Sequence, residues 1–125
     1  MDIFISNTSG QPIYEQIVSQ VKDKILKGQL KAEEPLPSIR LLARELRISV
    51  ITTKRAYEEL ERAGFIVTMA GKGSYVAPRD PGVMREEHLR RVEKYLSGAV
   101  EEARIGGVTK EELMEMLELL CQEND

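Results

Sequence analysis

Three features of the 125-residue sequence predict a mainly α-helical protein with one small β-hairpin. Residues 38–46 and 49–63 each show the apolar spacing of a short amphipathic helix. Residues 65–77 follow as two β-prone runs around a glycine-containing tip. This order is typical of a winged helix-turn-helix, which the sequence predicts over residues 1–80, followed by a helical region over residues 81–125.

Local start and stop residues define the predicted helices. Ser38 and Ser49 precede the two short helices, and a serine there can accept a backbone N–H of the first turn. Gly64 follows the last apolar position of the second helix and supplies the left-handed conformation that ends a helix. An earlier helix is expected with Pro12 in its first turn and Gly28 at its end.

The exposed face of the second short helix carries candidate DNA-reading groups. On a helical wheel, Ile51 and Arg55 lie opposite the buried positions, with Thr52 and Lys54 on the flanks. Ile51 is an apolar β-branched residue on the solvent side, where a thymine methyl group could be its partner. The alternative is that the charges merely solvate a surface helix and that Ile51 is an ordinary exposed apolar residue.

The predicted hairpin has a cationic tip, in which Lys72 stands between Gly71 and Gly73. A Gly-x-Gly hairpin alone is weak evidence, since many turns have this composition. The sequence has neither the glycine spacing nor the following helix of a phosphate-binding loop. The position of the hairpin directly after the second helix is what identifies it as a wing.

Over residues 8–78 the chain resembles the GntR family of bacterial transcription regulators. The run Leu36–Ala43 (LPSIRLLA) and the tip Gly71–Gly73 stand where that family's pattern has them, and Ser49–Leu60 resembles its small YtrA-like subfamily. The resemblance implies DNA contacts from the start of both helices and from the wing tip. Many family members have an arginine where this chain has Val50, so a different sequence preference is expected. Taken together with the exposed helix face, the candidate DNA-binding residues are Arg40, Ser49, Val50, Ile51, Thr52, Lys54, Arg55, Gly71 and Lys72.

The net charge of −3 is distributed unevenly along the chain. Residues 1–80 hold 12 Lys and Arg against 10 Asp and Glu, a balance of +2, whereas residues 81–125 hold 6 against 11, a balance of −5. Between Ser38 and Tyr57 there are five basic residues and one acidic residue. The local field of the predicted helix pair therefore favours phosphate although the whole chain is acidic.

The region after residue 80 reads as two helices with a large apolar surface. A 3, 4 spacing in the first is typical of a coiled-coil seam, and Thr109 with Glu112 forms a capping box at the start of the second. The apolar stripes exceed what a lone two-helix hairpin could bury, so a second copy of the chain is expected to cover them. The alternative is that both helices fold back on the winged domain of their own chain. The predicted dimerisation residues are Leu89, Val92, Leu96, Ala99, Ala103, Leu113, Met116, Leu117 and Leu120.

The residue inventory argues against an enzyme, a metal site or a cofactor. His88 is the only histidine and Cys121 the only cysteine, so one chain cannot assemble a cysteine/histidine zinc site or a serine–histidine pair. Neither a secretory signal nor an apolar run of about 20 residues is present, so a cytoplasmic chain without a membrane partner is expected. The tail is too short to enclose a drug-sized pocket, which leaves a small-molecule effector unknown.

The sequence therefore predicts a homodimeric transcription regulator, specifically a repressor, that binds a two-fold symmetric double-stranded DNA operator. The family resemblance suggests a transporter operon as its target. One alternative is a winged-helix module that binds a protein instead of DNA. A truncated relative of the pyridoxal-phosphate enzyme-like members is the third interpretation. The operator sequence and the sign of regulation stay open.

Overall fold

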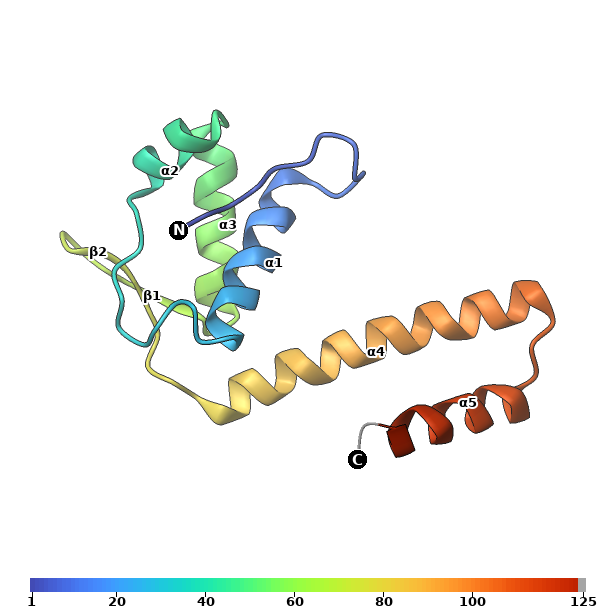
Figure 1. The fold of residues 1–125 in the computed structure, drawn as a ribbon. Coiled ribbons are helices and arrows are strands. Elements are labelled where there is room, and N and C mark those ends of the chain that lie inside the picture. The colour runs from blue at the N-terminus through green and yellow to red at the C-terminus, as the bar shows by residue number, and fades with distance from the viewer. Residues whose placement is uncertain (124–125) are drawn as a thin grey trace. The chain divides into compact units, whose positions relative to one another are not determined.

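The computed structural model describes residues 1–123, and the chain divides into two compact units, Met1–Met84 and Arg85–Asp125. The first unit contains three helices, α1 (Ile13–Leu26), α2 (Ile39–Leu46) and α3 (Val50–Arg62), and two strands, β1 (Ile66–Met69) and β2 (Gly73–Val76) (Figure 1). Helix α4 (Pro81–Gly106) begins in the first unit and continues in the second, which also contains α5 (Lys110–Glu123). The predicted mainly α-helical fold with one β-hairpin is confirmed.

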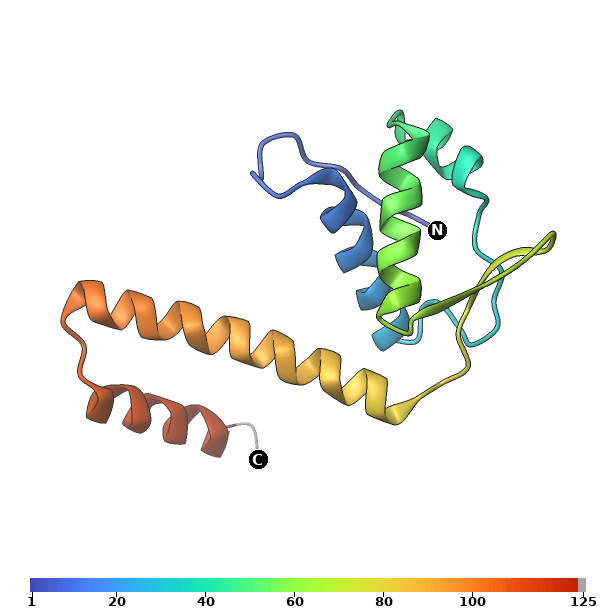
Figure 2. The same cartoon turned by 180° about the vertical axis from the view of Figure 1, so that it is seen from behind.

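The core of the first unit lies between α1, α2 and α3. Figures 1 and 2 show α1 and α3 side by side, and α2 packs on α3. Ile17 and Val21 of α1 and Leu60 of α3 have no exposed surface. Each apolar side chain of this size contributes about 1.5–3 kcal/mol when it is removed from water.

The predicted caps form at both short helices. The hydroxyl of Ser38 accepts the Leu41 amide at 3.1 Å, and that of Ser49 accepts the Thr52 amide at 3.0 Å. Gly64 follows α3 with a φ of +86°, the left-handed conformation that its position predicts.

Two helix ends differ from what the sequence predicts, at the start of α1 and at the end of α2. Pro12 stands at the N-cap of α1, one position before the first turn where it was expected. Arg47 ends α2 with a φ of 57°, a left-handed conformation that a non-glycine residue adopts only at some cost. The expectation that Gly28 ends α1 agrees with its φ of +75° directly after the C-cap.

Strand β2 is hydrogen-bonded along both edges. It pairs antiparallel with β1, from Ile66 opposite Val76 to Met69 opposite Gly73. On its other edge, the amides of Glu33 and Leu36 donate to β2 carbonyls at 2.9 Å, and the Val76 amide donates back to Glu34 at 2.9 Å. This third, short partner of the sheet was not among the elements expected from the sequence.

An N-terminal arm lies along α1 and is held by two glutamine side chains. The amide group of Gln20 bonds both the N–H and the carbonyl of Phe4, at 2.9 and 2.7 Å. Gln16 bonds the backbone of Ser6 in the same way, at 2.8 Å each. These side chains take the place of a neighbouring strand, and Ile3 of the arm is buried in the core.

The second unit exposes most of its apolar side chains. None of the described residues of α5 is buried, and in α4 only Glu87 and Ala103 are. The predicted capping box is present, because Thr109 and Glu112 exchange hydrogen bonds at 3.1 and 3.0 Å. Thr109 donates to this carboxylate from both its amide and its hydroxyl, and these two bonds lower the pKa of Glu112.

The first turn of α4 packs on the core of the first unit. Val83 and Met84 contact that core, and the boundary between the two compact units falls after Met84. The domain division after residue 80 stays a prediction. Within residues 1–123 no helix is both long and apolar enough to cross a bilayer.

One buried hydrogen bond makes a sharp test of the packing between α3 and the segment before α2. The hydroxyl of Tyr57 donates to the carbonyl of Pro37 at 2.6 Å, and burial raises the pKa of this phenol. We expect Tyr57→Phe to lower the free energy of unfolding by about 1–2 kcal/mol, because the carbonyl loses its donor. The measurement is urea denaturation at fixed protein concentration. Tyr95→Phe, at a side chain that is 75% exposed, is the control, and equal stability of the two variants would contradict the assignment.

Candidate nucleic-acid interface

The first turns of α3 present an exposed surface that combines apolar and cationic groups. Ile51 is 81% exposed and Val50 49%, and Lys54 is exposed one turn further along. The hydroxyl of Ser49 also forms a hydrogen bond with the hydroxyl of Thr52, at 2.7 Å. The start of the helix is thus fixed by its own side chains while its outer surface stays open to solvent.

The opposite face of α3 holds this surface in place. Thr53, Ala56, Tyr57 and Leu60 are buried, as the apolar spacing predicted. The hydroxyl of Thr53 also donates to the Ser49 carbonyl at 3.0 Å, which satisfies its polar group in the interior. Because one turn of a helix takes 3.6 residues, burial of these positions directs residues 50, 51 and 54 outward.

Arg55 takes part in a contact that the sequence did not indicate. The centre of its guanidinium lies 3.8 Å from the ring centroid of Tyr14 on α1, which is a close cation–π stack. The Tyr14 hydroxyl lies 3.1 Å from the Glu15 carboxylate, and this hydrogen bond raises the pKa of Tyr14 while the charge of Arg55 opposes the rise. Such a stack holds a guanidinium in one orientation on the α1 side of α3. The DNA contact of Arg55 stays a prediction.

The wing tip is a tight turn with bonds on both faces of the hairpin. Gly71 and Gly73 have φ values of 75° and 90°, and the amide of Lys72 donates to the Met69 carbonyl at 2.9 Å. On one face, the hydroxyl of Tyr75 donates to the Lys72 carbonyl at 2.9 Å.

The opposite face of the hairpin has a bond of its own, between the hydroxyls of Thr68 and Ser74, which lie 2.9 Å apart. Sequence reasoning missed Tyr75 as a residue that holds the tip, because only the register of the hairpin brings its hydroxyl there.

Three of the candidate DNA-binding cations have no ion-pair partner within the described residues. Arg40, Lys54 and Lys72 are exposed, and none of them forms an ion pair within residues 1–123. At the other end of α3, Arg62 is paired with Glu59. Unpaired cations are therefore present at the start of α2, at the first turns of α3 and at the wing tip.

The described part of the chain holds no cluster of three or more His, Cys, Asp or Glu side chains that could bind a metal ion. It does contain a capped helix pair, a second helix whose exposed start carries an unpaired cation, and a short β-hairpin that follows this helix. These features define a winged helix-turn-helix DNA-binding protein.

Comparison with known proteins identifies the family. The sequence model of the bacterial regulatory proteins of the gntR family matches residues 13–76, and the chain belongs to this family. The HTH-type transcriptional repressor YtrA of Bacillus subtilis (strain 168) is 36% identical over 115 residues, which cover 92% of this chain and 88% of that protein.

Two solved structures share the fold over most of the chain. YtrA from Sulfolobus acidocaldarius, a GntR-family transcription factor, is 36% identical with a TM-score of 0.63, over 78% of this chain and 97% of that chain. A transcriptional antiterminator from Listeria monocytogenes EGD-e is 31% identical with a TM-score of 0.74, over 98% of this chain and 92% of that chain. The chain is thus a DNA-binding transcription regulator and not an enzyme.

The bond from Tyr75 to the wing tip generates a prediction. We expect Tyr75→Phe to increase hydrogen exchange at the amides of Gly71–Gly73, because the Lys72 carbonyl loses the donor that fixes the turn. DNA affinity should fall by roughly twofold to fivefold, which corresponds to a typical net hydrogen bond. Exchange is measured by NMR on the free protein, with Thr68→Val as the variant that loses the bond on the other face. Unchanged exchange at the tip in Tyr75→Phe would refute the role of the hydroxyl.

Proposed function

We propose that the chain is a homodimeric repressor that binds a two-fold symmetric DNA operator, with the start of α3 in the major groove. The observation that carries the proposal is the exposed set of side chains at the first turns of α3, where Lys54 has no ion-pair partner, together with a cationic wing tip in the same unit. The name of the Bacillus subtilis relative supports the repressor role. A regulator of this kind acts on DNA in the cytoplasm.

Base reading is assigned to the first turns of α3. Val50 and Ile51 offer methyl groups that suit the C5-methyl of thymine, while the hydroxyls of Ser49 and Thr52 can bond base edges or phosphates. Because Val50 is not an arginine, it supplies no bidentate contact to guanine, and the preference should favour thymine-containing steps.

Phosphate binding is assigned to the surrounding cations and to the wing. Arg40 at the start of α2, Lys54 and Arg55 on α3, and Lys72 with Gly71 at the tip would flank the groove and neutralise the backbone. The support is that Arg40, Lys54 and Lys72 have no internal ion-pair partner within the described residues. Such contacts fix the register of the protein on the duplex and contribute little sequence preference.

Dimerisation is assigned to α4 and α5. Six of the nine predicted dimerisation residues are large apolar side chains that are 45–57% exposed in the single chain, namely Leu89, Val92, Leu96, Met116, Leu117 and Leu120. Tyr95, Val100, Ile105, Met114 and Leu119 are exposed as well. Ala99 is also exposed, whereas Leu113 is half-buried and Ala103 is buried. An apolar surface of this extent on a soluble chain favours a second copy as its cover.

The first test of this proposal concerns the phosphate contacts. Arg40→Ala and Lys72→Ala should each weaken binding to specific and unrelated duplexes alike and lower the dependence of log K on log salt by about one unit. Lys110→Ala, which removes an exposed cation from α5, is the matched control. A change of base preference at constant salt dependence in Arg40→Ala would show that this residue reads bases.

The second test concerns the apolar side chain of Ile51. Replacing a contacted thymine by uracil removes one methyl group and should cost on the order of 1 kcal/mol of binding free energy. Ile51→Ala should erase this difference, whereas Ile51→Val should keep most of it. Affinities are measured by fluorescence anisotropy on operator duplexes with single replacements. Equal affinities for thymine and uracil at every position would exclude the contact.

The third test separates dimerisation from folding. A chain that ends at Met84 keeps the whole core of the first unit, so it should fold and be monomeric. Its affinity for a full operator should fall by roughly 100-fold or more, because the second half-site is no longer tethered. Light scattering gives the mass, and an operator half-site, which both forms should bind alike, is the control. A truncated chain that stays dimeric would assign α4 and α5 to another partner.

A further inference from the structure

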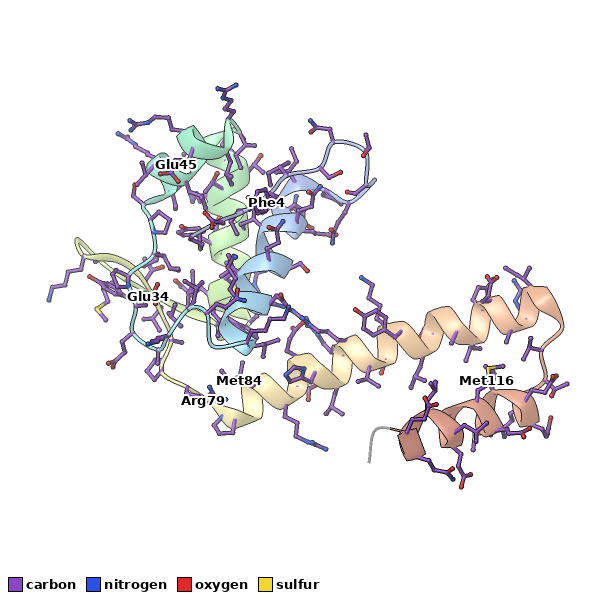
Figure 3. The ribbon with its side chains drawn as sticks, viewed as in Figure 1. Phe4, Glu34, Glu45, Arg79, Met84 and Met116 are labelled. Carbon is purple, nitrogen blue, oxygen red and sulfur yellow. The ribbon has the colours of Figure 1, made fainter. Side chains whose placement is uncertain are left out.

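A hollow of about 190 Å³ lies in the first unit, at the end of β2 that is remote from the wing tip. Its walls come from the end of α1, the segment that follows it, the end of β2 and the first turn of α4. Ile25, Leu30 and Val76 are buried core residues that form an apolar floor, and Met84 closes one side. Figure 3 labels Met84 and, near it, Arg79.

The charged residues that line this hollow are both cations. Lys31 and Arg79 are exposed, and neither forms an ion pair or a side-chain hydrogen bond within residues 1–123. Two acids lie close to these cations in sequence, and the carboxylate of each accepts a backbone amide. The carboxylate of Glu34 accepts the Lys31 amide at 3.1 Å, and that of Asp80 accepts the Gly82 amide at 2.9 Å at the start of α4. The hollow therefore combines an apolar floor with two cationic side chains that form no ion pair within residues 1–123.

We infer that this hollow binds a small organic carboxylate whose apolar body is about one aromatic ring in size. An apolar protein cavity of about 150 Å³ accommodates benzene, so 190 Å³ holds a ring and leaves space for a carboxylate toward the rim. The ring would lie against Leu30 and Met84, and Lys31 and Arg79 would bind the charge. This division into an apolar wall and a few charged groups is what small-molecule sites have in common.

The position of the hollow suits an effector ligand. The hollow is lined by Ala77 and Arg79, in the segment that leads from β2 to α4, and by Met84 in the first turn of α4. It includes no residue of α3 and none of the wing tip. The ligand would thus act on the connection to α4 without competing for the DNA-binding residues.

The test uses the intact chain with sodium benzoate as the probe. We expect saturable NMR shifts of the amides of residues 30–32, 77, 79 and 84, and no shift at Lys72. Benzyl alcohol has the same ring without the charge and should bind about tenfold more weakly, since the charge-assisted bonds are lost. Shifts that grow linearly without saturation, or equal affinity for the two compounds, would overturn the inference.

Variants locate the site and remove the alternative of a general attraction between anions and the protein. Lys31→Gln combined with Arg79→Gln should reduce benzoate affinity about tenfold, and both side chains are exposed, so folding should be unaffected. Arg85→Gln combined with Lys110→Gln removes the same charge outside the hollow and should leave affinity unchanged. Equal losses in both double variants, or saturable shifts that cluster on α2 and α3 instead, would also overturn the inference.

Discussion

The burial of one face of α3 against α1 and α2 is the constraint on which the rest of the first unit depends. Thr53, Ala56 and Leu60 have no exposed surface, so α3 cannot rotate about its axis without losing the core. The same constraint fixes the outward direction of Ile51 and Lys54, because helix geometry relates the two faces rigidly. The exposed surface at the start of α3 is thus a consequence of the packing and of the Ser49 cap.

Helix limits and the exposed face of α3 could be predicted because their causes are local. A serine cap, a glycine after the last turn and the spacing of apolar residues act within about five residues. The contacts that were missed join distant positions. Neither the clamp of Gln20 on Phe4 nor the stack of Arg55 on Tyr14 leaves a periodic trace in the sequence. The pairing of residues 33–36 with β2 was missed for the same reason.

The two units differ both in net charge and in how much of their apolar surface is exposed. In the first unit, the apolar residues are mostly internal, and exposed cations without an ion pair include Arg40 on α2, Lys54 on α3 and Lys72 at the wing tip. In the second, large apolar side chains are exposed among an excess of acids. Acids on the tail keep an exposed apolar stripe soluble and reduce its attraction for phosphate. The acidic net charge is therefore compatible with a DNA-binding unit whose own field is positive.

Strand β2 connects the wing tip to the hollow of the first unit. Its first residue, Gly73, belongs to the wing tip, and its last, Val76, lines the hollow. On its outer edge, β2 is bonded to residues 33–36, which lead directly to Ser38 and the start of α2. These bonds run along both edges of one four-residue strand, so β2 links the wing, the segment before α2 and the hollow through hydrogen bonds. A ligand in the hollow would therefore contact the strand that carries the wing, while the exposed surface of α3 remains unoccupied.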